Sequence, residues 1–451
     1  MVTRPWLVRH AQYRRSWPGI LNRVFPSACW QRLEATRCRN GNNARAGWTW
    51  PALILGCICL GWSGCREITA RFQQARQALT ALLAEALPGS YQGFCQQLRS
   101  GGWALFEQVM AQLRPRIIRL GRKAWYHGGW IPFAVDGSRF DLPRSRANER
   151  AFSRAGRKRT GPQLWATLLT HLPTGAIWNW RQGPGTASER HHLRAMLDTL
   201  PQRSLLVADA GFVGFELLAE LASRPQAFLI RCAGNVSLRS WAGCLGEQVD
   251  VQRAGGRVYV WTKQAQRQRQ PALALRLIVL KTAGQPVCLL TNVQSNPELP
   301  KLQAAQLYRM RWGIEVTHRH LKQTLERRRL RCGNPDNGLM ELAANVLALA
   351  VLMLHALTVL GVRIGQVSVA AVVKLLRKAV EGLTWRILWT GLAWALKQAV
   401  RDDYTRHAPK TRRRWPSKKR DAPPRPPEVR TFSEQELRNL LDLGYVLVKT
   451  G

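Results

Sequence analysis

Acidic side chains are scarce in this sequence. Only 27 Asp and Glu stand against 68 Lys and Arg in 451 residues, which gives a formal net charge of +41. Solubility alone needs far less excess charge. Lys and Arg release the counterions condensed on a phosphate backbone, so the excess favours nucleic acid as the partner. An anionic membrane surface is the rival partner.

Disulfide and metal–thiolate patterns are also missing. Ten cysteines in a chain of this length do not make a disulfide scaffold. Cys57, Cys59 and Cys65 lie close together, but no second pair and no histidine at zinc-like spacing accompanies them. Free thiols suit a reducing compartment, so we expect a cytoplasmic, nucleoid-associated protein.

Long uninterrupted apolar runs are absent as well. Residues 52–62 are too short to span a bilayer. Residues 339–362 are long enough, but Glu341, Asn345 and His355 interrupt them. Uncompensated polar groups are costly in lipid, so we interpret this stretch as a buried core helix and predict no transmembrane span.

The texture of the chain changes several times along its length. Residues 1–65 are rich in Arg and Trp without clear periodicity, which leaves disorder as an open interpretation. Residues 66–125 repeat apolar positions every three or four residues, as amphipathic helices do, and form a helical N-terminal region that is a candidate for DNA binding.

Residues 126–365 read as the main domain. The order of its elements is β-β-β-α-β-α-β, which predicts an α/β fold with a mixed sheet. At about 234–300 the pattern is interrupted by RVYVWTK, LALRLIVLK and PVCLLTNV, three strand candidates that indicate a β-rich insertion. A helical C-terminal extension is expected at 366–405.

The last segment, 406–451, is a basic, proline-rich tail that cannot build a core by itself. It either clamps DNA through phosphates or is simply solvated. Ser433 and Glu436 form a capping-box pattern that predicts a short helix near its end.

One helical stretch, YRMRWGIEVTHRHLK, carries a single acid among many cations. On an ideal wheel Tyr308, Arg311, Glu315 and Lys322 share an arc of about 60°, while the leucines face elsewhere. A solvated face with i,i+4 charge pairs is the plain alternative. Trp312 falls beside this arc, and we interpret it as packing under the site.

Two further acids stand where strands are predicted to end. Asp136 follows the apolar run PFAV, and Asp209 follows LLVA. Either one alone could be a structural cap. A carboxylate at the end of a buried strand is poorly hydrated unless it pairs with a cation or binds a metal. Together with Glu315, the two aspartates suggest a shared carboxylate site for Mg²⁺ or Mn²⁺.

Phosphodiester cleavage and transfer is the chemistry that needs such a set. Two metal ions can hold the attacking and the leaving oxygen of an in-line displacement. Bridging Asp136, with Asp209 and Glu315 on separate ions, would supply the ligands. Tyr308, Arg311 and Lys322 would grip phosphates beside the scissile bond.

At this point a family resemblance becomes visible. The spacing Y-x2-R-x3-E-x6-K at Tyr308, Arg311, Glu315 and Lys322 resembles the YREK signature of bacterial insertion-sequence transposases of the DDE class, in the fourth insertion-sequence family. VDGSRFDLPRS, LVADAGFVG and LLTN also resemble blocks of that family. The resemblance covers about 130–360.

The resemblance implies an RNase H-like catalytic core whose β-rich insertion precedes the helix with the glutamate. It implies Mg²⁺-dependent cut-and-paste transposition: nicking, hairpin formation, and joining of the 3′-OH to target. Double-stranded DNA at the transposon ends and the target, and a homodimer that pairs the ends, are the implied partners. An insertion-domain tryptophan, Trp241 or Trp261, is expected to help hold a flipped base, although either could be core.

Three other functions remain open from the residues alone. A catalytically silent DNA-binding protein derived from a transposase would keep the fold and the charge without needing the acids. A structure-selective nuclease of the same fold would need the acids but not the whole Tyr/Arg/Lys stripe. A basic protein with solvated acids would show no metal dependence.

Overall fold

The protein is described by a computed structural model that covers residues 24–39, 48–83, 87, 89–152, 161–234, 236–241, 251–282, 285–360, 368–381, 398 and 425–444. The chain divides into two compact units, and each is described by itself. Unit 1 is drawn from residues 1–125, 137–192 and 313–404, and unit 2 from 126–136, 193–312 and 405–451. Strand β1 (Ile131–Asp141) passes from unit 2 into unit 1.

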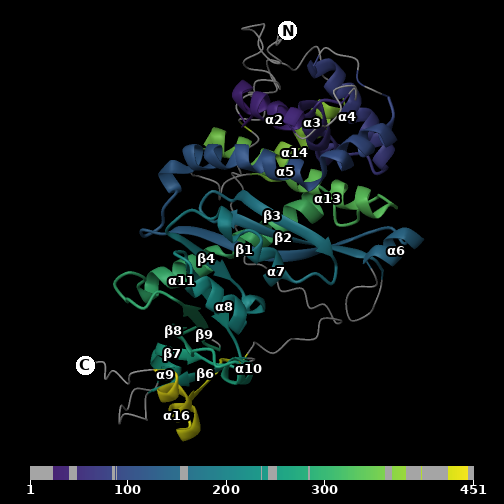
Figure 1. Ribbon diagram of the computed structural model, residues 1–451. Helices are drawn as coiled ribbons and strands as arrows, with labels where there is room; N and C mark the ends of the chain where they lie inside the picture. Colours follow the sequence, from purple (N-terminus) through teal and green to yellow (C-terminus); the bar gives the residue numbers. More distant parts are fainter. Residues whose placement is uncertain are drawn as a thin grey trace, which may run out of the picture. The chain divides into compact units, whose positions relative to one another are not determined.

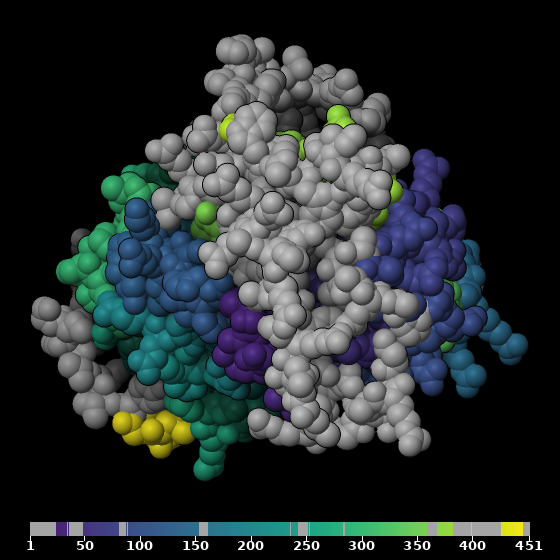
Figure 2. Space-filling model, turned by 90° about the horizontal axis from the view of Figure 1, so that it is seen from above, coloured from purple at the N-terminus to yellow at the C-terminus, as the bar shows by residue number. Residues whose placement is uncertain are grey.

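Unit 1 is mainly helical. Its principal helices are α2 (Ser27–Arg39), α3 (Trp50–Trp62), α4 (Ile68–Leu83), α5 (Tyr91–Gly121), α6 (Arg146–Phe152), α13 (Pro335–Leu360) and α14 (Val369–Val380). Helix α7 (Glu189–Arg194) and helix α12 (Trp312–Arg319) each extend across the boundary between the units. Described residues of α2, in purple, and of α4 and α5, in blue, reach the surface in the view from above (Figure 2).

Helices α2 and α3 fall in residues 1–65, which received no structural assignment from sequence. Every residue of α3 is buried. Gly61 lets α3 approach α13 closely, since a Cβ on Gly61 would lie only 2.3 Å from the Cβ of Ala348. The indole Nε1 of Trp62 donates to the Ala348 carbonyl at 3.0 Å. Helix α3 therefore forms a closely packed pair with α13 in the core.

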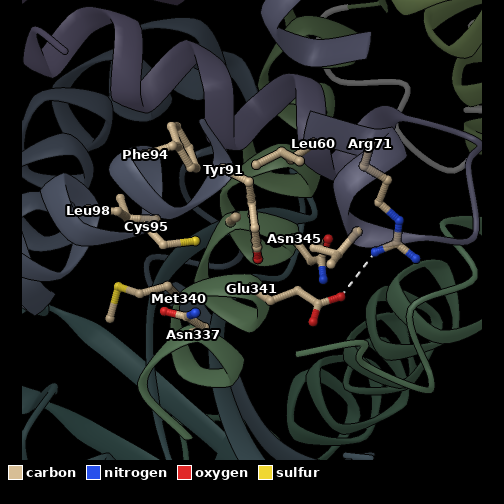
Figure 3. A pocket seen from close by; sticks show the side chains of 12 residues that line it. Leu60, Arg71, Tyr91, Phe94, Cys95, Leu98, Asn337, Met340, Glu341 and Asn345 are labelled. Atoms are coloured by element: carbon tan, nitrogen blue, oxygen red, sulfur yellow. Dashed lines mark hydrogen bonds and ion pairs between the residues drawn. The ribbon is translucent and has the colours of Figure 1, made fainter. Parts of the chain in front are cut away.

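Among the described residues, one helix, α13, is long and apolar enough to cross a membrane. However, 89% of its apolar window is buried inside the protein. Glu341 pairs with Arg71 at 3.0 Å, and Asn345 accepts a hydrogen bond from Arg327 at 3.2 Å. A cavity of about 20 Å³, room for roughly one water molecule, lies beside the ion pair between α3, α4, α5 and α13 (Figure 3). The predicted buried core helix is confirmed.

The strands of unit 1 are the second half of β1, β2 (Gln163–His171) and β3 (Ala176–Pro184). Strands β2 and β3 form an antiparallel hairpin. Leu142, just past β1, donates its N–H to the carbonyl of Pro162, just before β2, at 3.0 Å, so β1 and β2 run in opposite directions. Helices α5 and α13 contact β3 (Figure 1).

Unit 2 continues the sheet from the first half of β1. Its strands are β4 (Ser204–Ala208), β5 (Ala227–Cys232), β6 (Ser237–Ser240), β7 (Gly256–Val260), β8 (Leu273–Leu280), β9 (Val287–Thr291) and β10 (Glu428–Thr431). Their order is β10-β6-β7-β8-β9-β5-β4-β1. Strands β4 and β5 run parallel to β1, and β9 runs antiparallel to β5. The strand order around β1, β3-β2-β1-β4-β5, is that of the expected RNase H-like core.

Short helices of unit 2 complete this arrangement. They are α8 (Phe215–Ala222), α9 (Val251–Ala254), α10 (Lys263–Arg267), α11 (Lys301–Met310) and α16 (Glu434–Asp442). Helix α8 contacts β5 and β8, and α11 contacts β8. The three strand candidates of the insertion are the strands β7, β8 and β9, and they extend the main sheet.

The C-terminal segment completes the insertion. Strand β10 pairs in parallel with β6, and Ser433 and Glu436 form the predicted capping box of α16. Phe432 packs on Trp241 with ring centroids 4.6 Å apart. Glu436 binds the guanidinium of Arg239 with oxygen–nitrogen distances of 3.0–3.1 Å. Residues 406–424, the basic part of the expected tail, and 382–397 and 399–405 of the expected extension lie outside the described residues.

Candidate active site

Two of the three predicted catalytic acids, Asp136 and Asp209, occupy equivalent positions on neighbouring parallel strands. Strands β1 and β4 pair from Ile131 with Ser204 through Ala134 with Val207. Continuing this register by two residues sets Asp136 opposite Asp209. Strands in a sheet lie about 4.8 Å apart, and register partners on parallel strands point to the same face. Asp136 therefore lies beside Asp209, which directly follows the last residue of β4. The predicted strand end at Asp136 is wrong, because β1 continues through Gly137 to Asp141.

The local sequence explains why both acids stand at the edge of the core. The five residues before each of them are fully buried, whereas Asp136 and Asp209 are half-buried. Asp209 is the N-cap of a short 3₁₀ turn, η4 (Ala210–Phe212), and its Oδ1 accepts a hydrogen bond from the Gly211 N–H at 2.9 Å. This bond fixes the orientation of the carboxylate and uses one of its two oxygens.

Arg231 extends the same row by one strand. Strand β5 pairs with β4 through Ala208 and Ile230, so the next register position sets Arg231 opposite Asp209. Arg231 was not predicted from the sequence. The available signal was that Arg231 follows the apolar run AFLI just as Asp136 follows PFAV and Asp209 follows LLVA. Two acids and one cation thus stand side by side across β1, β4 and β5.

Tyr308, in α11, lies within electrostatic range of this row. Burial raises the pKa of the Tyr308 phenol; the Asp209 carboxylate adds to the rise, while Arg311 and Arg231 oppose it. The guanidinium carbon of Arg311 is 5.6 Å from the centroid of the Tyr308 ring. Unit 2 therefore brings Asp209, Arg231, Tyr308 and Arg311 together, with Asp136 at the neighbouring register position.

The other two predicted site residues, Glu315 and Lys322, belong to unit 1. Glu315 is half-buried in α12. Lys322 lies in η5, a π-helical turn over His320–Thr324, where Leu325 donates to the carbonyl of His320 at 2.8 Å. Single π-helical turns are rare and concentrate at functional sites. The Lys322 ammonium is 5.3 Å from the centroid of the Phe140 ring on β1.

The three tryptophans singled out from sequence have different surroundings. Trp241 and Trp261 join the aromatic cluster of the insertion with Tyr259 and Phe432, and the Trp261 indole donates to the Gln270 carbonyl at 2.9 Å. Trp261 is buried in this cluster and Trp241 is half-buried against it, and a role of either residue in holding a flipped base stays a prediction. The interpretation of Trp312 as a residue packed under the site is wrong, because 56% of this residue is exposed. Helix α11 ends at Met310 and α12 begins at Trp312, so the ideal wheel does not hold across this point.

The donor set fits a hard divalent cation. In the described part of the chain, no group of three or more Asp, Glu, His or Cys side chains is placed to hold a metal ion unaided. Mg²⁺ does not need one, because it keeps several water ligands and is usually bound by one or two carboxylates together with substrate phosphates. Two neighbouring carboxylates repel each other unless a cation lies between them. Asp136 and Asp209 are two neighbouring carboxylates of this kind, so the ligands that they offer suit Mg²⁺.

The mixed sheet and its two adjacent acids are the features expected of a domain of the DDE transposase class. In agreement, residues 131–351, about half of the chain, match the family model described as "Transposase DDE domain". These residues therefore belong to the transposase DDE domain family.

The curated relative is of the insertion-sequence type. The chain is 26% identical over 246 residues to "Transposase InsG for insertion sequence element IS4" of Escherichia coli (strain K12), a match that covers 50% of this chain and 52% of the relative. The chain thus spans about half the length of the curated relative it matches. Among solved structures it is similar to the piggyBac transposase in a synaptic complex with hairpin DNA, with 11% identity, a TM-score of 0.41 and 85% coverage of each chain.

Proposed function

We propose that this chain is a DNA transposase that cuts and joins phosphodiester bonds with the help of divalent metal ions. The observation that carries the proposal is the row Asp136–Asp209–Arg231 at one register level across three adjacent parallel strands, inside the region that matches the transposase DDE domain. The charge of +41 supports double-stranded DNA as the substrate, at both the transposon ends and the target.

Asp136, Asp209 and Glu315 are the residues that would hold the metal, with Mg²⁺ as the ion, two ions as the number, and Mn²⁺ as a substitute. Bound there, Mg²⁺ would supply charge neutralisation at the scissile phosphate and lower the pKa of an attacking water. Carboxylate oxygens are the ligands that such hard ions prefer.

The remaining residues position the DNA. Arg231 and Arg311 present guanidinium groups that match a phosphate with two parallel hydrogen bonds. The Tyr308 phenol is protonated at neutral pH, since an ordinary phenol has a pKa of about 10 and burial raises that of Tyr308 further, so it acts as a hydrogen-bond donor. Lys322 contributes a point charge from unit 1. Positioning of this kind supplies most of the catalysis in phosphoryl transfer.

The course of the reaction follows from the resemblance to insertion-sequence transposases. Nicking would free a 3′-OH at the transposon end, and this hydroxyl would attack the opposite strand to give a hairpin. Reopening of the hairpin would return the 3′-OH for joining to the target. Two ends must be held together for this, which supports a homodimer.

The test combines purified protein, Mg²⁺ and duplex DNA from the flanks of its own gene. Hairpin-ended products on a denaturing gel are expected, and EDTA is expected to abolish them. Nicked products without hairpins would instead assign a structure-selective nuclease. Binding without any cutting would assign a silent DNA-binding protein.

Three substitutions locate the chemistry. Asp136→Asn, Asp209→Asn and Glu315→Gln are each expected to leave DNA binding in place and to remove cutting. Asp198→Asn is the matched control, because the Asp198 side chain is 85% exposed and, among the described residues, pairs with Arg224 alone at the surface. Full cutting by any of the three variants would contradict the assignment of that acid.

A further inference from the structure

A pocket of about 590 Å³ lies within unit 1, apart from the residues assigned above. It is formed by the end of β1, the loop that follows it, the start of β2 and the segment 328–331. Its polar lining consists of Asp141, Gln163 and four arginines, Arg144, Arg328, Arg329 and Arg331. Four cations against one acid make it a strongly positive concave surface.

The backbone that carries three of these arginines is pinned on the side of the sheet. Asp141 donates its N–H to the Arg328 carbonyl at 2.9 Å and accepts from the Leu330 N–H at 2.8 Å. Asp141 and Arg329 thereby form a parallel β-bridge. Segment 328–331 is held against β1 as a short added strand.

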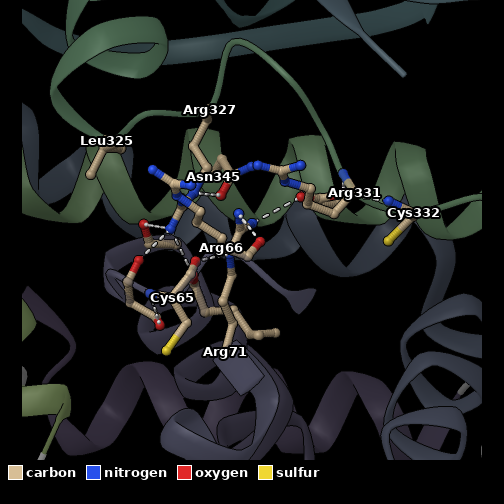
Figure 4. A network of polar contacts seen from close by, with 12 residues as sticks. Cys65, Arg66, Arg71, Leu325, Arg327, Arg331, Cys332 and Asn345 are labelled. Carbon is tan, nitrogen blue, oxygen red and sulfur yellow. Dashed lines mark hydrogen bonds and ion pairs between the residues drawn. The ribbon is translucent and has the colours of Figure 1, made fainter. Parts of the chain in front are cut away.

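The same segment is pinned again on the side of the helices. The Oε2 atom of Glu341 accepts the N–H groups of Arg331 and Cys332 at 2.7 and 3.0 Å. Just before the segment, the buried Arg327 donates to Asn345 and to the carbonyls of Leu60, Gly61 and Ser63 at the end of α3 (Figure 4). Buried and exposed residues follow each other: Arg327, Leu330 and Cys332 are anchors, and Arg328, Arg329 and Arg331 are exposed.

The charges inside the pocket are only partly neutralised. Arg144 pairs with Glu149 at 2.8 Å, and Arg328 lies 4.0 Å from Asp141, which also accepts from Gln163 at 2.7 Å. The side chains of Arg329 and Arg331 have no ion-pair or hydrogen-bond partner within the described ranges. Guanidinium groups that are fixed by a rigid backbone and lack an acid are suited to bind a phosphate with paired hydrogen bonds.

We propose that this Arg329–Arg331 pocket is a second phosphate-binding site that holds the DNA backbone beyond the residues of the active site. This rests on the proposed function. Its place in the chain favours a continuing strand, because Lys322 lies against Phe140, the residue before Asp141. None of the described residues that line the pocket is aromatic, so it offers no aromatic platform for a base, and its arginines suit a backbone phosphate better than a free nucleotide.

The experiment measures how DNA binding depends on salt. The probe is a fluorescently labelled 20-bp duplex without transposon-end sequence, titrated with wild-type protein and with the double variant Arg329→Gln/Arg331→Gln at several NaCl concentrations. The slope of log K against log[salt] is about −0.9 per neutralised phosphate in B-DNA. Removing two contacts is therefore expected to make the slope shallower by about 1.8.

The matched control is Lys263→Gln/Arg267→Gln, which removes two exposed cations at the two ends of α10. Its slope is expected to equal that of the wild type. A second pocket variant, Arg329→Lys/Arg331→Lys, keeps the charge and is expected to keep the slope while binding more weakly. The Gln and Lys variants should unfold at the wild-type temperature, since neither arginine side chain has an ion-pair or hydrogen-bond partner in the described part of the chain.

An unchanged slope in the Gln variant, with the wild-type unfolding temperature retained, would overturn the proposal. So would competition by ATP or pyrophosphate that the Gln variant abolishes without any change in its DNA slope, because the pocket would then serve free phosphates. Mg²⁺-dependent cutting by the wild type is measured in parallel. If the wild type cuts DNA and the Gln variant has an unchanged salt slope, the phosphate-binding site is refuted and the transposase function is not. If the Gln variant has a shallower slope but the wild type does not cut, the transposase function is refuted and the phosphate-binding site is retained.

Discussion

Glu341→Gln is the substitution that probes most directly how unit 1 holds its loops. The Glu341 carboxylate is 4% exposed and the Arg71 side chain 2%. One carboxylate oxygen accepts from Arg71, and the other accepts from the N–H groups of Arg331 and Cys332. A glutamine has one acceptor oxygen, so its NH₂ group must face either Arg71 or the two backbone donors.

The expected cost is large because the ion pair is buried. Removing one charge of a buried pair leaves the other uncompensated and costs about 3–5 kcal/mol. At about 2–4 °C per kcal/mol for a domain of this size, the thermal transition of unit 1 should fall by roughly 10 °C. Loss of a charged acceptor should also speed amide exchange at Arg331 and Cys332 by about 10–100-fold.

Circular dichroism and hydrogen exchange read out the two effects separately. The control is Glu67→Gln, in the turn before α4, whose carboxylate makes no ion pair among the described residues and whose loss should move neither observable. If Glu341→Gln unfolds at the wild-type temperature and the two amides keep their protection, the reasoning from the buried pair is refuted.

Three further outcomes follow from the structure. Arg231→Gln is expected to slow DNA cutting by about 100-fold without a change in the unfolding temperature, since one preorganised donor to the phosphate is lost. Arg231→Lys should recover part of the cutting rate. Wild-type cutting rates in both variants would contradict a role for Arg231 in the site. Burial lowers the pKa of His171 to about 4, below the unfolded value of about 6.5, so the stability tied to neutral His171 is complete above pH 6.5 and is lost as the pH falls toward 4. That loss amounts to about 3 kcal/mol, and a melting series in which His171→Asn shows the same slope as wild type over this range would contradict it. Phe432→Ala removes a ring that is 4% exposed, so unit 2 should lose about 3–5 kcal/mol and become more sensitive to proteolysis at the insertion; an unaltered digestion pattern would count against the packing role.

The parts of the fold that depend on local pattern were predictable from sequence. Apolar runs followed by an acid predicted β1 and β4, and the interruption of the pattern at about 234–300 predicted the strands of the insertion. Arg231 was not predictable, because its role depends on the register of β5 against β4, which no local pattern encodes. The packing interpretation of Trp312 was wrong, because this residue is 56% exposed. The role of Lys322, which lies in the π-helical turn that begins at His320, stays a prediction.

Other features depended on contacts between distant segments. Helix α3 looked like an isolated apolar stretch, since its partner α13 lies nearly 300 residues away. The same holds for Glu341, which interrupts an apolar helix in the sequence but meets Arg71 in the fold. Such residues become interpretable only when both partners are placed.

The docking of β10 and α16 on the insertion has a consequence for synthesis. Strand β6 leaves the ribosome about 190 residues before its neighbour β10. At 5–20 residues per second this is a delay of roughly 10–40 s. During that time the aromatic rings of Trp241 and Tyr259 are not yet covered by Phe432. A chain broken before residue 425 would carry every residue of the proposed active site and still display this uncovered aromatic surface, which is the kind of surface that chaperones and proteases recognise.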